Sequence, residues 1–365
     1  MKIIEYLKEH NNISNGELLH KLFVKYAIKS VQSKKYPELY LFKYTIKSPM
    51  NEIICQECRS IIINIDTLEI VSHPYHKFFN HGDELAHEID WNTATCYEKL
   101  DGSIMIMYFY KGEWNVSTSG MPDGDGLIND ISGKTFAETF WELWNILGYR
   151  LPNYFRSFTF MFEMVTKYNK IVCDYDKENI SLHGMRNNKT TKEYIPNKTH
   201  FNWKIVKSHK LSNISDVIEF VNSRPAKKHE GIIVCDANFN RIKIKSEEYF
   251  NLHHIKSGLN CMKNIVELVR IHKAEETIKM FPEHEAEIRD IECKIDNLWE
   301  DINEIYYRIK DIKSQKEFAS QACLHRFKSI LFSMRKDDVD NCYKYLEVMR
   351  IKNLMKMIGV KSDEK

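Results

Sequence analysis

The sequence predicts an α+β fold in which antiparallel sheets with flanking helices are followed by an all-helical C-terminal region. Between about residues 40 and 250, short runs rich in β-branched and aromatic residues alternate with Gly, Asn, Asp and Pro, as expected for strands joined by turns. Beyond about residue 255 these runs stop, and apolar residues recur at helical spacing. Because the strands do not alternate regularly with helices, the pattern disfavours a doubly wound α/β fold.

The first region is expected to consist mainly of short strands. Lys111-Gly112 separates two strand-like runs, as expected for a tight hairpin turn. One helix is expected at about 134–147. The clearest expected strands are Arg59–Asp66, Ser103–Tyr110, Phe158–Val165, Gly231–Asp236 and Arg241–Lys245.

The second region is expected to contain one long helix that begins near Pro282, because proline suits a first turn. Eight apolar residues lie alternately three and four apart, which places them on one stripe. They are Ile288, Ile291, Ile295, Leu298, Ile302, Ile305, Ile309 and Ile312. The spacing recurs from Val339 to Met349, so we expect an intramolecular helical hairpin, with a dimeric coiled coil as the alternative. The expected domains are 1–254 and 255–365.

Composition indicates a globular protein of the cell interior. The 365 residues are 43% hydrophobic and 28% charged, and the net charge is only +2, so a nucleic-acid surface must be a local patch. Because the N-terminus is charged and no stretch approaches about 18 uninterrupted apolar residues, we expect neither a signal peptide nor a membrane-spanning segment. Nine scattered cysteines suggest reduced thiols and a cytoplasmic location.

The sharpest motif is Lys99-Leu100-Asp101-Gly102-Ser103, placed just before a predicted strand. Taken alone, it also suits a charged turn. As a catalytic motif it offers a lysine amine, which attacks phosphorus only when unprotonated, and neighbouring cations would lower its pKa toward that state. Gly102 would let the backbone approach a ligand closely.

Further elements occur in order over about residues 40–255. They are Phe42-Lys43-Tyr44, Glu57-Cys58-Arg59, Lys77-Phe78-Phe79-Asn80, Phe162-Glu163, Asn169-Lys170-Ile171-Val172, Glu230-Gly231, Lys243-Ile244-Lys245-Ser246, Tyr249 and Leu252-His253. With Lys99-x-Asp101-Gly102-Ser103, this order resembles the covalent nucleotidyltransferases, and most closely the RNA ligase 1 family of T-even bacteriophages.

The resemblance implies a nucleotidyltransferase domain over 1–254, with two antiparallel sheets around an ATP cleft, and a helical RNA-specificity domain over 255–365. It implies that Lys99 takes AMP from ATP, within a catalytic set of Lys99, Asp101, Gly102, Glu163, Glu230, Lys243 and Lys245. Residues implied to bind the nucleotide are Tyr44, Arg59, Lys77, Phe79, Glu98, Lys99, Glu163, Gly231, Lys243, Lys245 and Tyr249. Mg²⁺, for which Mn²⁺ can substitute, would be held by Glu163, Glu230 and Glu275.

Two positions depart from the family's pattern. The family tends to place lysine before a glycine where this chain has Ser119-Gly120, and Ser60 follows Arg59 where glycine is usual. The missing lysine removes one phosphate contact. A zinc site of Cys55-x-x-Cys58 with His73-x-x-His76 is disfavoured, because the histidines are too close together in sequence.

The resemblance therefore implies an ATP-dependent RNA ligase that joins 5′-phosphate and 3′-hydroxyl ends, with cleaved tRNA or another structured RNA as substrate by family analogy. We expect a monomer without membrane partners. Because no G-x-x-x-x-G-K-[ST] loop occurs, the end-processing kinase or phosphatase is expected to be a separate protein. The alternatives are a GTP-using capping enzyme, a DNA ligase, or a catalytically lapsed RNA-binding protein.

Within the helical region, the stretch 313–336 is the most basic, and Phe318, Phe327 and Phe332 are interleaved with its cations. If these rings were exposed, they could stack on unpaired bases.

Overall fold

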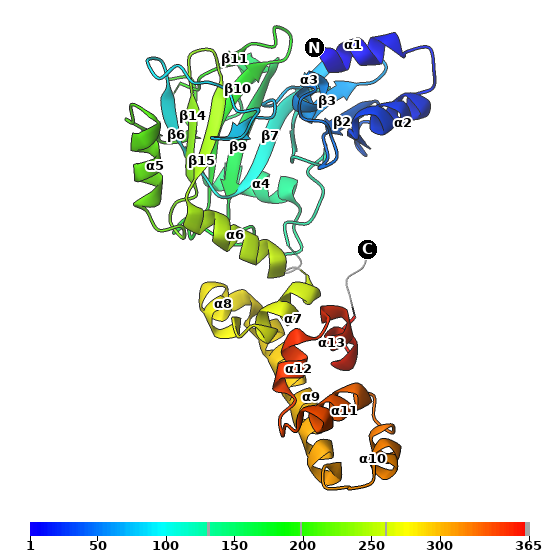
Figure 1. Ribbon diagram of the computed structural model, residues 1–365. Helices are drawn as coiled ribbons and strands as arrows, with labels where there is room; N and C mark the ends of the chain where they lie inside the picture. The colour runs from blue at the N-terminus through cyan, green and yellow to red at the C-terminus, as the bar shows by residue number, and fades with distance from the viewer. Residues whose placement is uncertain (130–131, 198, 260, 362–365) are drawn as a thin grey trace. The chain divides into compact units, whose positions relative to one another are not determined.

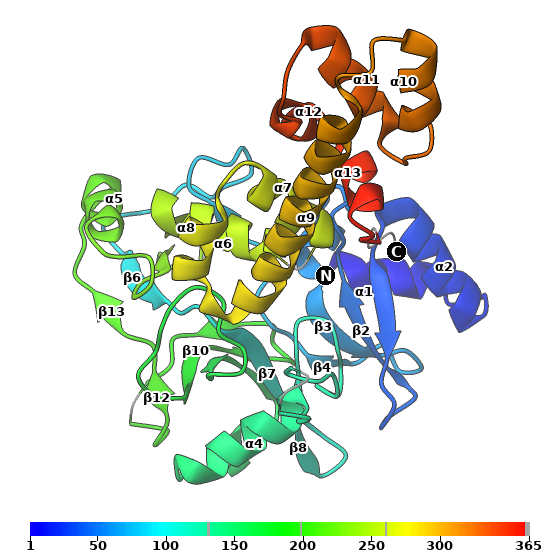
Figure 2. The same ribbon diagram turned by 90° about the horizontal axis from the view of Figure 1, so that it is seen from below.

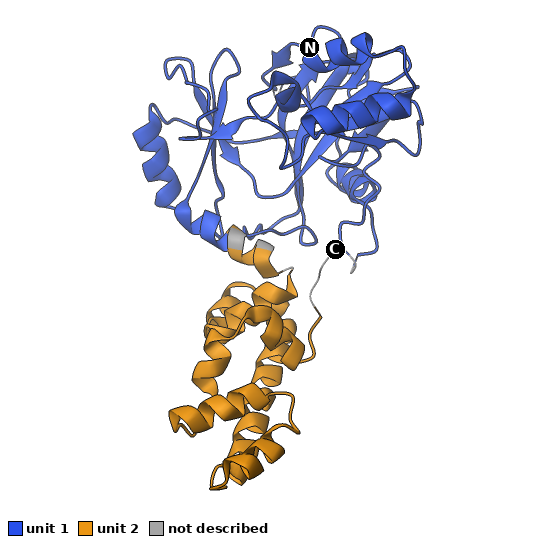
Figure 3. Ribbon diagram, turned by 45° about the vertical axis from the view of Figure 1, so that its right-hand side comes forward, with its two compact units in different colours: residues 1–252 blue, residues 253–365 orange. Residues whose placement is uncertain are grey.

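A computed structural model describes residues 1–129, 132–197, 199–259 and 261–361 of the protein. The described chain divides into two compact units, Met1–Leu252 and His253–Lys365 (Figure 3). The expected boundary at 254/255 falls inside helix α6 (Glu247–Leu259), which runs across this division.

The first unit contains three sheets rather than the two that we expected (Figure 1). The first has the order β1 (Lys29–Gln32), β2 (Leu39–Lys43), β3 (Arg59–Asn64), β4 (Ile70–Ser72). The second has the order β11 (Glu193–Tyr194), β10 (Asn179–Asn187), β9 (Phe158–Val165), β7 (Ser103–Tyr110), β8 (Glu113–Ser117), with β12 (Lys204–Ile205) on β10. The third has the order β13 (Ser208–His209), β6 (Thr95–Lys99), β14 (Gly231–Cys235), β15 (Arg241–Lys245), β5 (Phe79–Asn80).

Among the described strands, all pairs are antiparallel except β10 with β12 and β15 with β5. The N-terminal 43 residues, most of which precede the predicted strands, supply helices α1 (Lys2–Glu9) and α2 (Asn15–Tyr26) and the strands β1 and β2 of the additional sheet. Helix α3 (Ile53–Glu57) precedes β3, and a short 3₁₀ turn (Asn153–Phe155) precedes β9.

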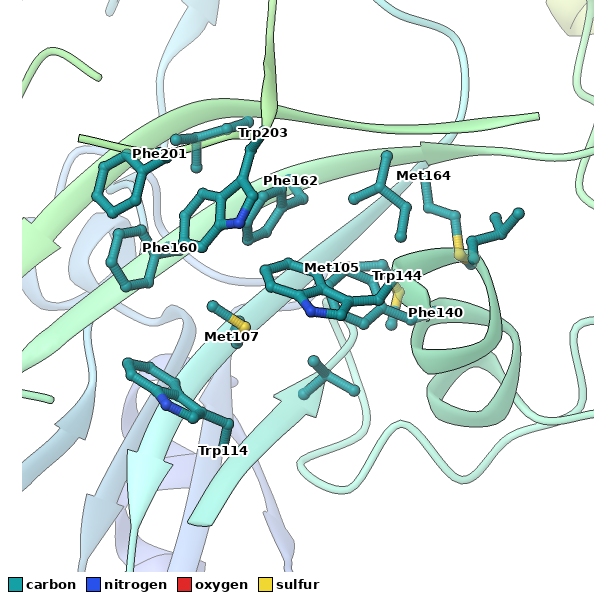
Figure 4. Packing of buried hydrophobic residues seen from close by; sticks show 14 of the residues in the cluster. Met105, Met107, Trp114, Phe140, Trp144, Phe160, Phe162, Met164, Phe201 and Trp203 are labelled. Carbon is teal, nitrogen blue, oxygen red and sulfur yellow. The ribbon is translucent and has the colours of Figure 1, made fainter. Parts of the chain in front are cut away.

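One face of the second sheet is buried beneath helix α4 (Phe136–Ile146) (Figures 2 and 4). Alternate residues of β9 point to this core, among them Phe160, Phe162 and Met164. Thr135 caps the helix, because its hydroxyl accepts from the Glu138 backbone N–H while the Glu138 carboxylate accepts from the Thr135 N–H. Glu163 lies on the opposite face of β9, which points away from this core.

Helix α5 (Ile214–Asn222) covers one face of the third sheet in the same way. Val217 and Val221 of the helix pack against Ile232 and Val234 of β14 and Ile244 of β15. The alternation of β15 therefore puts Lys243 and Lys245 on the face away from α5.

The second unit is helical. It holds α7 (Met262–Arg270), α8 (Ala274–Met280), a 3₁₀ turn (Pro282–His284), the long helix α9 (Glu285–Ile309), α10 (Gln315–Ala322), α11 (Lys328–Asp337), α12 (Tyr343–Val348) and α13 (Ile351–Met357). The expected single hairpin partner is absent among the described residues, because α9 packs against several short helices, including α7, α10 and α11 (Figure 2). Ile312 lies beyond the end of α9, and Tyr306 is buried where Ile305 was expected.

Phe318 and Phe327 are buried in the second unit. The suggestion that they stack on RNA bases is therefore wrong, because both rings already pack in the helical core. Within the described ranges, no helix is long and apolar enough to cross a membrane. All nine cysteines are described, and all carry free thiols.

Candidate active site

A cleft of about 620 Å³ opens in the first unit. All three sheets contribute to its wall, for example through Lys43 of β2, Glu163 of β9 and Lys243 of β15. The predicted site residues that line it are Arg59, Glu98, Lys99, Gly102, Glu163, Lys243 and Lys245.

The candidate nucleophile, Lys99, stands in a row across three strands. It lies opposite Gly231 of β14, which in turn lies opposite Lys245 of β15. Residues in such a row share one face, so the two lysines flank a position that has no side chain. A Cβ on Gly231 would lie 2.1 Å from the Ile244 carbonyl oxygen. Gly231 is thus required by strand packing, and it is not among the residues that line the cleft.

Glu230 joins the two lysines. Its Oε1 lies 2.7 Å from Lys99 Nζ and 2.8 Å from Lys245 Nζ, and its side chain is only 3% exposed. Burial lowers the pKa of Lys99, but the charges of Glu230 and Glu163 outweigh burial, so the pKa is raised. Our expectation that neighbouring cations lower this pKa was wrong, because two carboxylates act on Lys99 more strongly. A nucleophilic Lys99 would therefore have to lose a proton before attack.

Glu163 faces the cleft because its neighbours in β9 face the core. Burial raises the pKa of its carboxyl to about 8; Lys99 opposes this shift, and Glu230 and Asp101 add to it. Its Oε2 lies 3.7 Å from His183 Nε2, and burial lowers the pKa of His183 to about 3, so this imidazole is neutral. A buried carboxyl with a raised pKa is one that an added positive charge would ionise.

The residues present fit a magnesium ion held by few protein ligands. Among the described residues, no group of three or more His, Cys, Asp or Glu side chains could hold a metal. Mg²⁺ commonly binds through one or two carboxylates together with substrate phosphates and water, which such a site allows. Glu163 is the best placed ligand, because Glu230 already binds two lysines.

The cations of β15 and β3 meet in the cleft. Burial lowers the pKa of Lys243 to about 8, and Lys77, Arg59, Lys245 and Lys99 lower it further as neighbouring positive charges. Lys243 has no acidic partner among the ion pairs of the described residues. A cluster of cations of this kind suits a polyanionic ligand.

Tyr44, Lys77 and Phe79 come together, but they do not line the cleft. The Lys77 ammonium lies 5.1 Å from the ring centre of Tyr44 and 5.6 Å from that of Phe79. In this cation–π arrangement Lys77 is still close enough for its positive charge to lower the pKa of Lys243. The prediction that all three contact the nucleotide is therefore not supported by the lining of the cleft.

Asp101 anchors the loop after Lys99. Its Oδ2 accepts from the backbone N–H groups of Val172 and Cys173, each at 2.7 Å, and its Oδ1 accepts from the Tyr249 hydroxyl at 2.6 Å. Asp101 and Tyr249 are both buried and neither lines the cleft. The expectation that Tyr249 packs on the nucleotide therefore gains no support, because its hydroxyl holds Asp101 and its side chain does not line the cleft.

Gly102 is needed for packing against β9. A Cβ there would lie 2.4 Å from the Met164 carbonyl oxygen. The glycine therefore serves close approach of two backbone segments, and not only approach of a ligand as we expected.

Glu98 points to the face that α5 covers. Its carboxylate accepts from His229 Nδ1 at 2.6 Å and from His209 Nε2. Burial raises its pKa, but these two hydrogen bonds outweigh burial and the pKa is lowered. Glu98 is predicted to bind the nucleotide, where either its carboxylate or its backbone carbonyl could accept from the adenine amino group. Because the carboxylate is engaged by the two histidines, the backbone carbonyl is the remaining acceptor.

Glu275 lies on α8 in the second unit. Its exposed carboxylate lies 2.5 Å from Arg289 Nη1, and this ion pair lowers its pKa. It is therefore neutralised within its own unit, and the expectation that it binds metal gains no support.

Among the lining residues that sequence reasoning missed are Lys43, His183 and Arg241. Arg241 stands two residues before Lys243 on β15, so strand alternation could have indicated it. It binds Glu193, and its guanidinium lies 4.4 Å from the ring centre of Tyr75. Lys43 belongs to Phe42-Lys43-Tyr44 but had no assigned role, and no sequence signal marks His183.

Comparison with known proteins gives consistent matches. A sequence model of the T4 RNA ligase 1 family, described as RNA ligase, matches residues 57–250. A protein of Autographa californica nuclear polyhedrosis virus, named putative bifunctional polynucleotide kinase/RNA ligase, is 27% identical over 71% of this chain, which spans 40% of that protein's length. An RNA ligase of Rhodothermus phage RM378 is 24% identical over 82% of this chain and 85% of its own.

Solved structures with distant similarity include an archaeal ATP-dependent RNA ligase, with 14% identity, a TM-score of 0.47 and coverage of 79% of this chain and 76% of that chain. A Naegleria gruberi RNA ligase mutant with ATP and Mn is 15% identical, with a TM-score of 0.35 and coverage of 44% and 52%.

Proposed function

The chain belongs to the RNA ligase family, and from this premise we propose that it is an ATP-dependent RNA ligase. The enzyme joins an RNA 5′-phosphate to a 3′-hydroxyl through lysyl-AMP and an adenylylated RNA. The observation that carries the proposal is the placement of Lys99 beside Glu230 and Lys245 in a cleft whose other wall residues include Arg59 and Lys243.

The reaction has three steps. Lys99 Nζ loses a proton and attacks the α-phosphorus of ATP, and the bond to pyrophosphate breaks. Glu230 Oε1, 2.7 Å away, is placed to accept that proton. An oxygen of the RNA 5′-phosphate then attacks the AMP phosphorus and Lys99 leaves as an amine. Finally a 3′-hydroxyl attacks the RNA phosphate, and AMP departs.

The cations of the cleft hold the phosphates and stabilise the charge that develops on them during transfer. Arg59, Lys243 and Lys245 have this role. Glu163 would hold Mg²⁺, which supplies further positive charge near the phosphates. The charge of an ion there would also oppose the effect of burial, which raises the pKa of Glu163, and the smaller repulsion from Glu230 and Asp101.

Nucleotide labelling tests the proposal. Wild-type protein with Mg²⁺ and α-labelled ATP should become covalently labelled, and Lys99→Ala should remain unlabelled. Lys111→Ala is the matched control, because Lys111 is an exposed lysine paired with Glu38 outside the cleft. Label that persists in Lys99→Ala would reassign the nucleophile.

Labelled GTP separates the alternatives. We expect a strong preference for ATP, because the Glu98 carbonyl can accept from the adenine amino group but would face the guanine carbonyl. Preferential labelling by GTP would indicate a capping enzyme. A folded protein that takes label from neither nucleotide would support a lapsed RNA-binding protein.

The natural substrate belongs to the proposal as well. We propose RNA ends, with cleaved tRNA or another structured RNA as the class, and a second unit that selects among them. A kinase or phosphatase outside these 365 residues would prepare the ends. A monomeric state and a cytoplasmic location complete the proposal, and sealing of a nicked stem-loop against a linear RNA tests the substrate class.

A further inference from the structure

The two departures from the family pattern, Ser60 and Ser119, contact each other. The Ser60 hydroxyl donates to the Ser119 carbonyl oxygen at 2.7 Å. Ser60 is the extra residue of a bulge, because Phe42 pairs with Ile61 and Lys43 pairs with Arg59. Its φ of 73° is left-handed, which explains why glycine is usual there. The serine therefore accepts backbone strain and ties the loop after β8 to β3.

Lys43 reaches the same loop from β2. Its Nζ donates to the Ser119 hydroxyl at 3.1 Å. A Cβ built on Gly120 would lie 3.5 Å from this Nζ, so the ammonium stands directly over Ser119-Gly120. Lys43, Ser119 and Gly120 all line the cleft. The Lys43 ammonium thus lies beside position 119, where the family's pattern has a lysine.

No carboxylate neutralises Lys43 in the ion pairs of the described residues. Burial lowers its pKa, and the charge of Arg59 lowers it further. A half-buried cation without an acid is costly to maintain unless a ligand compensates it. Because its known partner is one serine hydroxyl, Lys43 retains donors for an anion.

We propose that Lys43 is a phosphate-binding residue of the cleft, which supplies from β2 the cation that the position of Ser119 lacks. The inference rests on the proposed function. The shared chemistry is a phosphate group, which belongs either to the triphosphate of ATP or to the 5′ end of the RNA. Ser60 and Ser119 act as positioning residues, since they hold the loop against which the ammonium rests.

Four variants of the full chain test the inference. Lys43→Met removes the charge at similar volume, and Lys43→Arg keeps it. The exchange of Lys43→Ser with Ser119→Lys moves the cation to the family's position. Lys29→Met is the matched control, because Lys29 pairs with Lys43 across β1 and β2 but is exposed and does not line the cleft. Thermal unfolding confirms that each variant is folded.

Two single-turnover measurements separate the sources of the phosphate. The first follows lysyl-AMP formation from ATP, and the second follows AMP transfer from preformed lysyl-AMP to 5′-phosphorylated RNA. Lys43→Met should slow one of them by about tenfold or more, as expected for loss of a charge-assisted phosphate contact. Lys43→Arg and the exchange should each recover most of that loss, and Lys29→Met should match the wild type. Loss in the first step assigns the ATP phosphates, and loss in the second assigns the RNA phosphate.

Wild-type rates for Lys43→Met in both steps would overturn the inference and leave the proposed function intact. If the wild type itself takes no label, the proposed function fails, and direct binding decides the role of Lys43. In that case, calorimetry with ATP and with a 5′-phosphorylated oligonucleotide should show weaker binding for Lys43→Met. Unchanged affinity for both ligands would then overturn the inference.

Discussion

Ion pairs in the cleft and ion pairs on helix α9 use the same residue types in opposite surroundings. In the first unit, Glu230 is 3% exposed and serves two lysines whose side chains are 22% and 24% exposed. In the second unit, Lys294 and Asp290 lie one helical turn apart at 2.5 Å, and their side chains are 40% and 57% exposed. Composition alone, with a net charge of +2, cannot distinguish the two settings.

The difference follows from solvation. Removing a charge from water is expensive, so buried ionic groups persist where they are paired or hold a ligand. Exposed pairs on a helix are solvated in either state and contribute little. The buried charges of the cleft therefore need a partner or a ligand to compensate them. The charges of α9 are compensated mainly by water.

The largest effect is expected at the buried anchor. Asp101→Ala leaves three donors without their acceptor and should lower the free energy of unfolding by about 2–4 kcal/mol. Asp101→Asn should cost less than half as much, because its oxygen can still accept from Val172 and Cys173 while its amide faces the Tyr249 hydroxyl. Urea unfolding measures both. Asp176→Ala, at a 93% exposed side chain, is the control, and equal losses for Ala and Asn would contradict this account.

The next effect is the pH dependence of ATP binding without metal. The pKa of Lys243 is lowered to about 8, so its ammonium is present below that pH and is lost above it. Glu163, with a pKa raised to about 8, becomes negative over the same range. Both changes disfavour ATP, so affinity should fall by about tenfold or more between pH 7 and pH 9.

Calorimetry across this pH range measures the fall, and two variants separate its causes. Lys243→Arg should remove part of the fall, because a guanidinium stays charged. Adding Glu163→Gln should remove the rest. A fall that is unchanged in the double variant would assign the titration to other groups.

A smaller effect is expected at the bulge in β3. Ser60→Ala removes the donor to the Ser119 carbonyl but keeps a side chain at φ 73°, and should lower the free energy of unfolding by about 1 kcal/mol. Ser60→Gly loses the same bond but relieves the strain, so it should be more stable than Ser60→Ala by about 0.5 kcal/mol. Thermal unfolding of the wild type, Ser60→Ala and Ser60→Gly gives their order of stability. A Ser60→Ala protein more stable than Ser60→Gly would contradict the strain argument.

The smallest effect is expected on α9. Lys294→Ala should change the free energy of unfolding by less than about 0.5 kcal/mol, because the pair with Asp290 is exposed. Labelling by ATP should not change. A loss of more than about 1 kcal/mol would show that this pair stabilises the fold more than is expected of an exposed ion pair.

The sequence by itself determined the α+β class, the central strands and the long helix, because each rests on local periodicity. The expected strand Ser103–Tyr110 is β7, and α9 begins three residues after Pro282. It also indicated the family, since Lys99-x-Asp101-Gly102-Ser103 and the later elements are short and contiguous, and it predicts Lys99 as the nucleophile. The family match over residues 57–250 confirms that resemblance.

Tertiary structure alone decided which partners each motif residue contacts. Strand pairing placed Gly231 between Lys99 and Lys245, and folding over more than 140 residues gave Asp101 its partner Tyr249. Ser119 contacts Ser60, in the bulge of β3, and Lys43, on β2. Both contacts join segments that lie far apart in the chain. Solvent exposure and the distance between charges arise only when distant segments meet, and for this reason the sequence could not predict the raised pKa of Lys99.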